Sequence, residues 1–294
     1  MTDWPALEQN DATSETVHRW SQIVGKIRLA QTPLVNHYWN VPLYVTARGL
    51  TTSAMPDGAR LFEMELDFIE HVLRIRVSDG AVREIKLFAR SVADMYAEIF
   101  ATLRSLDIEC RIWPTPVEIE NPIPLDRDEE HHSYDRDWIE RLHRTLQLSS
   151  TALNQFRAEF IGKCSPVHFF WGSFDLAVTR FSGRPAPPRP DADAVTREAY
   201  SHEVSSVGFW PGNASRLPHA TFYSYASPEP DGFRGAKIEP PAAYYNEALG
   251  GFYLHLDELR RTPDPDATLL AFCRTTYDAA ATNGNWDRAL VRRS

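Results

Sequence analysis

Hydrophobic side chains recur at helical spacing in some stretches of the chain and alternate with polar side chains in others. The helical spacing predicts helices over about residues 14–29, 91–106, 135–161, 242–248, 253–261 and 265–282. The alternation predicts strands over about residues 39–47, 62–68, 72–77, 82–87, 110–113, 166–182, 200–210 and 219–226. Ser78-Asp79-Gly80 is a hairpin signal between two of these strands, so the sheets are expected to be mainly antiparallel.

Helix, sheet and helix therefore occur in this order twice, which predicts an α+β fold of mainly antiparallel sheets flanked by helices. The predicted halves are residues 1–134 and 135–294, and they can also form one continuous domain. Tyr38-Trp39 is weakly similar to Phe170-Trp171, and the two pairs have similar neighbours in the same order. This similarity is compatible with an internal duplication or with chance.

Composition and charge narrow the class of protein. The formal net charge of −9 argues against a general nucleic-acid binder and against attraction to anionic membranes. No apolar run reaches the ~18 residues that a membrane span needs, and the N-terminus has no signal-peptide pattern. Three widely spaced cysteines give neither a disulfide framework nor a zinc motif, so a soluble, cytoplasmic protein is expected.

Residues 165–184 mix large apolar side chains with groups that need polar partners. Read as one continuous strand, the segment places His168 and Arg180 on one face and Trp171 and Asp175 on the other, with Gly172 as a position where a bulge could change the phase. A guanidinium in this setting forms either a buried ion pair or a clamp for a carboxylate or phosphate.

The neighbouring strands supply further candidates, since sequential strands often pair. We expect His168, His202 and Glu203 to provide acid–base chemistry. The expected ligand-binding residues are Trp171, Asp175, Arg180, Arg184, Trp210 and Tyr223. His168, His202 and His219 could instead hold a divalent transition metal, or all three could be structural histidines with satisfied hydrogen bonds.

Several blocks of the sequence resemble one known family. They are Asn36-His37-Tyr38-Trp39, residues 165–184, residues 200–212, Phe222-Tyr223-Ser224-Tyr225 and Trp286-Asp287-Arg288. Together they resemble a bacterial family catalogued only as a domain of unknown function, over nearly the whole chain. The resemblance implies a bacterial, soluble, single-unit protein. It brings no catalytic residue, cofactor or substrate with it.

Two functions are compatible with these residues. The first is a soluble enzyme that acts on a small anionic molecule through a His, Glu and Arg site in an aromatic-lined pocket. The second is a non-catalytic protein that binds a small molecule or a protein partner and uses its histidines structurally. No nucleic-acid or membrane partner is expected, and the sequence leaves the oligomeric state open.

Overall fold

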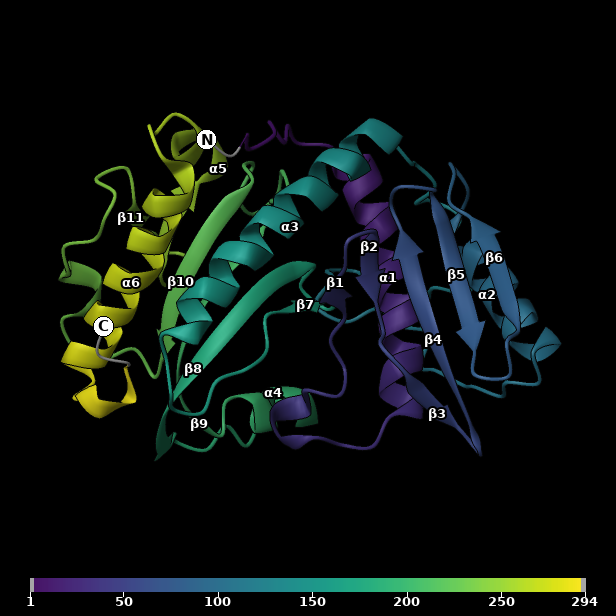
Figure 1. The fold of residues 1–294 in the computed structure, drawn as a ribbon, viewed down its shortest axis with the longest axis horizontal. Helices are drawn as coiled ribbons and strands as arrows, with labels where there is room; N and C mark the ends of the chain where they lie inside the picture. Colours follow the sequence, from purple (N-terminus) through teal and green to yellow (C-terminus); the bar gives the residue numbers. More distant parts are fainter. Residues whose placement is uncertain (1–2, 292–294) are drawn as a thin grey trace.

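The computed structural model describes residues 3–291, which form two six-stranded antiparallel sheets surrounded by helices (Figure 1). The predicted α+β class, with a similar helix–sheet–helix order in each half, is confirmed. The α-helices are α1 (Asp11–Gln31), α2 (Val92–Ser105), α3 (Arg136–Ala158), α4 (Ala194–Ala199), α5 (Leu256–Arg260) and α6 (Pro265–Asn283). Short 3-10 helices are η1 (Asn36–Tyr38), η2 (Phe233–Gly235) and η3 (Arg288–Leu290). None of the helices in residues 3–291 has the length and apolar character to cross a bilayer.

The first sheet has the strand order β1-β2-β4-β5-β6, with β3 paired to β4. Its strands are β1 (Tyr44–Val45), β2 (Gly49–Thr51), β3 (Met55–Asp57), β4 (Arg60–Asp67), β5 (Val72–Val77) and β6 (Val82–Lys86). The predicted hairpin at Ser78-Asp79-Gly80 joins β5 to β6. The α2 helix follows, and the Ser91 hydroxyl caps it by accepting a 3.0 Å hydrogen bond from the Asp94 amide.

The second sheet has the order β11-β12-β10-β9-β8-β7. Its strands are β7 (His168–Phe170), β8 (Asp175–Pro185), β9 (His202–Trp210), β10 (Thr221–Ser227), β11 (Tyr244–Tyr245) and β12 (Phe252–His255). On one face, Leu176, Val178 and Arg180 of β8 point toward α3 and α6, which contact this sheet. In Figure 1, α3 runs along nearly the same diagonal as β8. The opposite face lies near η1 and α4.

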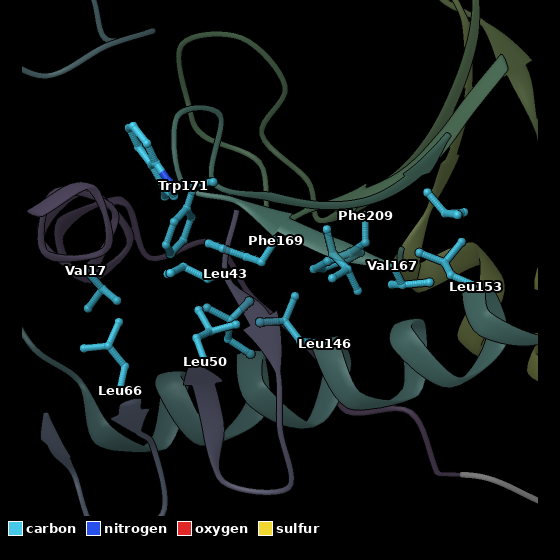
Figure 2. Packing of buried hydrophobic residues seen from close by; sticks show 14 of the residues in the cluster. Val17, Leu43, Leu50, Leu66, Leu146, Leu153, Val167, Phe169, Trp171 and Phe209 are labelled. Atoms are coloured by element: carbon cyan, nitrogen blue, oxygen red, sulfur yellow. The ribbon is translucent and has the colours of Figure 1, made fainter. Parts of the chain in front are cut away.

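The two sheets meet along a narrow seam. Leu43 and Phe169 exchange backbone hydrogen bonds of 2.9 and 2.8 Å, so β7 is linked to the chain just before β1. Beneath this bridge, Leu43, Phe169 and Leu146 of α3 belong to one buried hydrophobic cluster (Figure 2). Trp171 strengthens the seam, because its indole donates 2.8 Å to the Val41 carbonyl and packs against Gly25 of α1. A Cβ at Gly25 would lie 2.1 Å from the Trp171 ring, so that contact requires glycine.

Four predicted elements differ from the structure. Residues 166–182 form two strands of a hairpin, because residues 171–174 make a turn in which Phe174 adopts a positive φ of 60°. Residues 110–113 lie in a loop, and the helix predicted near 242–248 is replaced by β11 and a turn. The helix predicted over 253–261 begins only at Leu256, since β12 occupies the preceding residues.

Candidate functional site

A cavity of about 210 Å³ lies over the free face of the second sheet. Strands β7, β8, β9 and β10 form its floor, and α4 contributes to its wall. The first half of the chain adds His37, Tyr38, Trp39, Val41, Pro42 and Glu118. The cavity is therefore built by both halves, and the seam at Leu43 and Phe169 holds the contributing segments in place.

The register of the floor explains how the side chains meet. His168, Ala177, Gly208 and Tyr223 lie in one row across four neighbouring strands. Gly208 has no side chain, and a Cβ there would come 2.5 Å from the Tyr223 hydroxyl and 2.4 Å from the Leu176 carbonyl oxygen. Glycine at this position therefore lets the Tyr223 ring lean across β9 toward β8.

Asp175 is the central polar group of the floor. The Tyr223 hydroxyl donates a hydrogen bond to Asp175 Oδ2, whereas the buried Oδ1 has no hydrogen-bond partner among the residues that the structure describes. The residue is 8% exposed, and this burial raises the pKa of the Asp175 carboxyl to about 7, with the Tyr223 hydrogen bond opposing the rise and Glu118 adding to it. Asp175 is therefore a carboxyl group that can both give and take a proton near neutrality.

Glu118 reaches the cavity from the loop before α3. It accepts a 2.6 Å hydrogen bond from the Ser173 hydroxyl. Desolvation around the carboxyl raises the pKa of Glu118, although much of the residue is exposed. The cavity thus carries two carboxyl groups, and no lysine or arginine of residues 3–291 lines it.

Two imidazoles line the same cavity. His168 Nδ1 donates 2.9 Å to the Pro166 carbonyl, and His37 Nδ1 donates 2.8 Å to the Glu198 carbonyl. Burial lowers the pKa of both rings, so both are neutral with Nε2 as an acceptor. His37 Nε2 is buried and has no hydrogen-bond partner.

Hydroxyl groups complete the polar surface. Tyr200 and Tyr225 share a 2.8 Å hydrogen bond, and Thr179 and Ser206 share one of 3.0 Å. Burial raises the pKa of Tyr225 well above its usual value, so this hydroxyl stays protonated. The Arg189 guanidinium lies 4.3 Å from the Tyr200 ring centroid and donates a 2.7 Å hydrogen bond to the Ser227 hydroxyl of β10, which ties the segment that carries α4 to the floor.

The structure brings three of the sequence-predicted site residues to this cavity, namely His168, Asp175 and Tyr223. The expected sharing of a face by His168 and Arg180 is wrong, because the hairpin turn changes the phase between β7 and β8. Arg180 is 1% exposed, donates to the Phe156 carbonyl and stacks 3.4 Å from the Phe156 ring centroid, away from the cavity. Trp171 is buried at the seam, where it packs on α1.

The other predicted residues also lie outside the cavity lining. Arg184 forms an ion pair with Glu203 at 2.7 Å and also donates a hydrogen bond to the Gly284 carbonyl. The contact with Gly284 anchors the chain after α6. The side chains of Arg180 and Arg184 therefore form no anion clamp. Trp210 lies at the far end of β9.

The three histidines considered as metal ligands do not converge. His202 begins β9 opposite Pro185, whereas His219 precedes β10 near the other end of β9, where Thr221 pairs with Trp210. His202 has its ring 5.5 Å from that of His37, and His219 faces His255 at 4.9 Å. Over residues 3–291, no group of three or more His, Cys, Asp or Glu side chains is placed to hold a metal ion.

Sequence reasoning missed several lining residues. The lining also includes Trp39, Tyr200, Tyr225 and Glu118. It includes His37 as well, which the sequence analysis named only as part of a block that resembles the family. Tyr225 carried a usable signal, since strand alternation puts it on the same face as Tyr223. The others approach from loops and α4, whose positions depend on tertiary contacts.

Comparison with known proteins gives a family but no function. A family model described as "Family of unknown function (DUF5996)" matches residues 4–293. No curated protein and no solved structure matches the chain. The chemistry of the cavity is therefore the available guide to function.

Proposed function

The chain belongs to the family of unknown function DUF5996, and we propose that it binds a small molecule in this cavity and exchanges a proton with it through Asp175. One observation carries the proposal: a buried carboxyl on the cavity floor has one oxygen fixed by Tyr223 and the other without a partner. A buried polar atom without a partner costs stability, so a ligand that satisfies it gains affinity.

The proton role follows from the acidity of this group. The pKa of Asp175 is raised to about 7, so both protonation states are populated near neutral pH. Such a group contributes about 10²–10⁴-fold to a reaction that requires proton transfer. The neutral His168 ring lies across the floor as a second acceptor.

A binding protein without catalysis is the second candidate. The hydroxyl groups of the lining favour this candidate, because they are engaged in hydrogen bonds that do not activate them. Ser173 donates to Glu118, and Ser206 shares a hydrogen bond with Thr179. No hydroxyl of the lining forms a hydrogen bond with an imidazole that could activate it as a nucleophile. In this case Asp175 and Tyr223 hold the ligand and leave it unchanged.

A ligand screen with two variants tests the proposal. Small amines, alcohols and carboxylic acids are screened for a rise in the melting temperature of the wild-type protein, and the compounds that bind are incubated with it and analysed for products. Ala177→Leu adds bulk to the floor and should abolish binding, whereas Asp175→Asn should retain the fold and lose turnover. Binding that survives Ala177→Leu would place the site elsewhere. Turnover that survives Asp175→Asn would exclude the proton role.

A further inference from the structure

The charges of the cavity lining point to the class of ligand. Asp175 and Glu118 are the ionisable acids of the lining, and its two imidazoles are neutral. Resting on the proposed binding function, we propose that the ligand is a small organic cation that carries a protonated amino group. This assignment replaces the anionic ligand expected from the sequence, because neither Arg180 nor Arg184 lines the cavity.

The unpartnered atoms of the lining require hydrogen-bond donors. Asp175 Oδ1 and His37 Nε2 are both buried acceptors without a partner, in residues 8% and 5% exposed. The tautomer of His37 is set by the Glu198 carbonyl, which can only accept a hydrogen bond. An ammonium group has N–H donors and no acceptor, so it matches such atoms, and a carboxylate ligand does not.

Aromatic rings supply a second feature that suits a cation. Trp39, Phe170, Phe181, Tyr223 and Tyr225 line the cavity. The negative face of an aromatic ring attracts a cation by ~0.5–2 kcal/mol, and more strongly when water is excluded. The carboxyl of Asp175 therefore shares the cavity with rings that also attract a cation.

The charged groups around this lining belong to several elements. Lys163 lies 5.7 Å from the Trp39 ring centroid and 5.5 Å from that of Phe181, but it is exposed and outside the lining. Arg189 lies outside the lining on Tyr200. The groups that act on Asp175 itself are Tyr223, Glu118 and Ser173.

Binding should depend on pH in a defined way. A cation is attracted by ionised Asp175, and protonation of this carboxyl removes the attraction. Because the pKa of Asp175 is about 7, affinity for an amine should fall by up to about tenfold per pH unit below that value and level off above it. A neutral ligand should lack this dependence.

Four probes that share one ring separate charge from shape: benzylamine, benzyltrimethylammonium, benzyl alcohol and benzoate. Their binding to the full chain is measured by calorimetry at about pH 8, where Asp175 is ionised. We expect benzylamine to bind at least about tenfold more tightly than benzyl alcohol. Benzyltrimethylammonium, which has no N–H donor, should bind more weakly than benzylamine, and benzoate most weakly.

Variants connect this preference to the carboxyl group. Asp175→Asn should weaken the binding of benzylamine about tenfold or more and leave the binding of benzyl alcohol unchanged. Asp231→Asn changes an exposed aspartate outside the lining and should alter neither affinity. Glu118→Gln gives a second test at the same cavity, with a smaller loss expected because this residue is more exposed.

The outcomes distinguish the two proposals. Tighter binding of benzoate or benzyl alcohol, abolished by Ala177→Leu, would overturn the cationic ligand and leave the cavity as a binding site. Benzylamine binding that Asp175→Asn does not weaken would also overturn it. If neither these probes nor the wider screen gives binding that depends on Ala177, both proposals fail.

Discussion

The buried carboxyl of Asp175 should make the stability of the protein depend on pH, and the Asp175→Asn variant isolates this effect. An aspartate in the unfolded chain has a pKa near 3.8, and in the folded protein the pKa of Asp175 is about 7. Between these values the folded state holds a proton that the unfolded state has lost, so stability falls as pH rises. Each pH unit contributes ~1.4 kcal/mol, which gives about 4 kcal/mol over the whole interval.

Asparagine has the same shape and never ionises, so a protein with asparagine at this position does not lose stability through ionisation as the pH rises. We therefore expect Asp175→Asn to gain stability relative to wild type as pH rises, by about 4 kcal/mol between about pH 4 and pH 8. Denaturant unfolding at a series of pH values, followed by tryptophan fluorescence, measures the difference. Other titrating groups cancel in this comparison, and Asp231→Asn provides the control.

A flat difference between the two proteins would refute the reasoning. It would mean that water or a flexible floor solvates the carboxylate, so that Asp175 titrates near its ordinary value. A difference that rises with pH but levels off near pH 5 would indicate partial burial and would remove the basis for a proton role at neutrality.

Three further substitutions test neighbouring contacts. Tyr223→Phe removes the donor that lowers the pKa of Asp175, so the stability difference that Asp175→Asn produces in this background should level off at a pH above about 7. Gly208→Ala places a methyl group against Tyr223 and the Leu176 carbonyl, and should cost about 1–3 kcal/mol of unfolding free energy in denaturant titrations. Arg180→Met replaces a buried cation that has no carboxylate partner, so the melting temperature should be unchanged or higher; a fall of several degrees would contradict this.

Local patterns in the sequence were enough to predict much of the fold. Ser91 caps α2, and Tyr223 and Tyr225 share one face of β10. Residues 171–174 were the main failure, because Gly172 and Ser173 stand between large apolar residues that favour one continuous strand, so Gly172 indicated a bulge and not a turn. Buried packing holds it, with the Phe174 ring 5.0 Å from His18 of α1.

The site itself was only partly predictable. Tyr223 could be found because a strand pattern fixes which way each side chain points. Asp175 was found as a polar residue of the apolar segment, but the predicted strand put it on the face opposite His168, whereas the two residues line one cavity. Arg180 was misplaced because one unrecognised turn reverses the face of every residue after it. The contribution of His37 and Glu118 depends on loops that reach the cavity from far along the chain, and periodicity holds no information about such contacts.

The assembly of the cavity from both halves also bears on its history. A gene that encoded residues 135–294 alone would provide the floor without His37, Trp39 or Glu118, and a gene for the first half would provide no floor. If the halves descend from one ancestral unit, the site is younger than their fusion. Changes of ligand within the family should then appear as paired substitutions, one in residues 37–42 and one on β8 or β10.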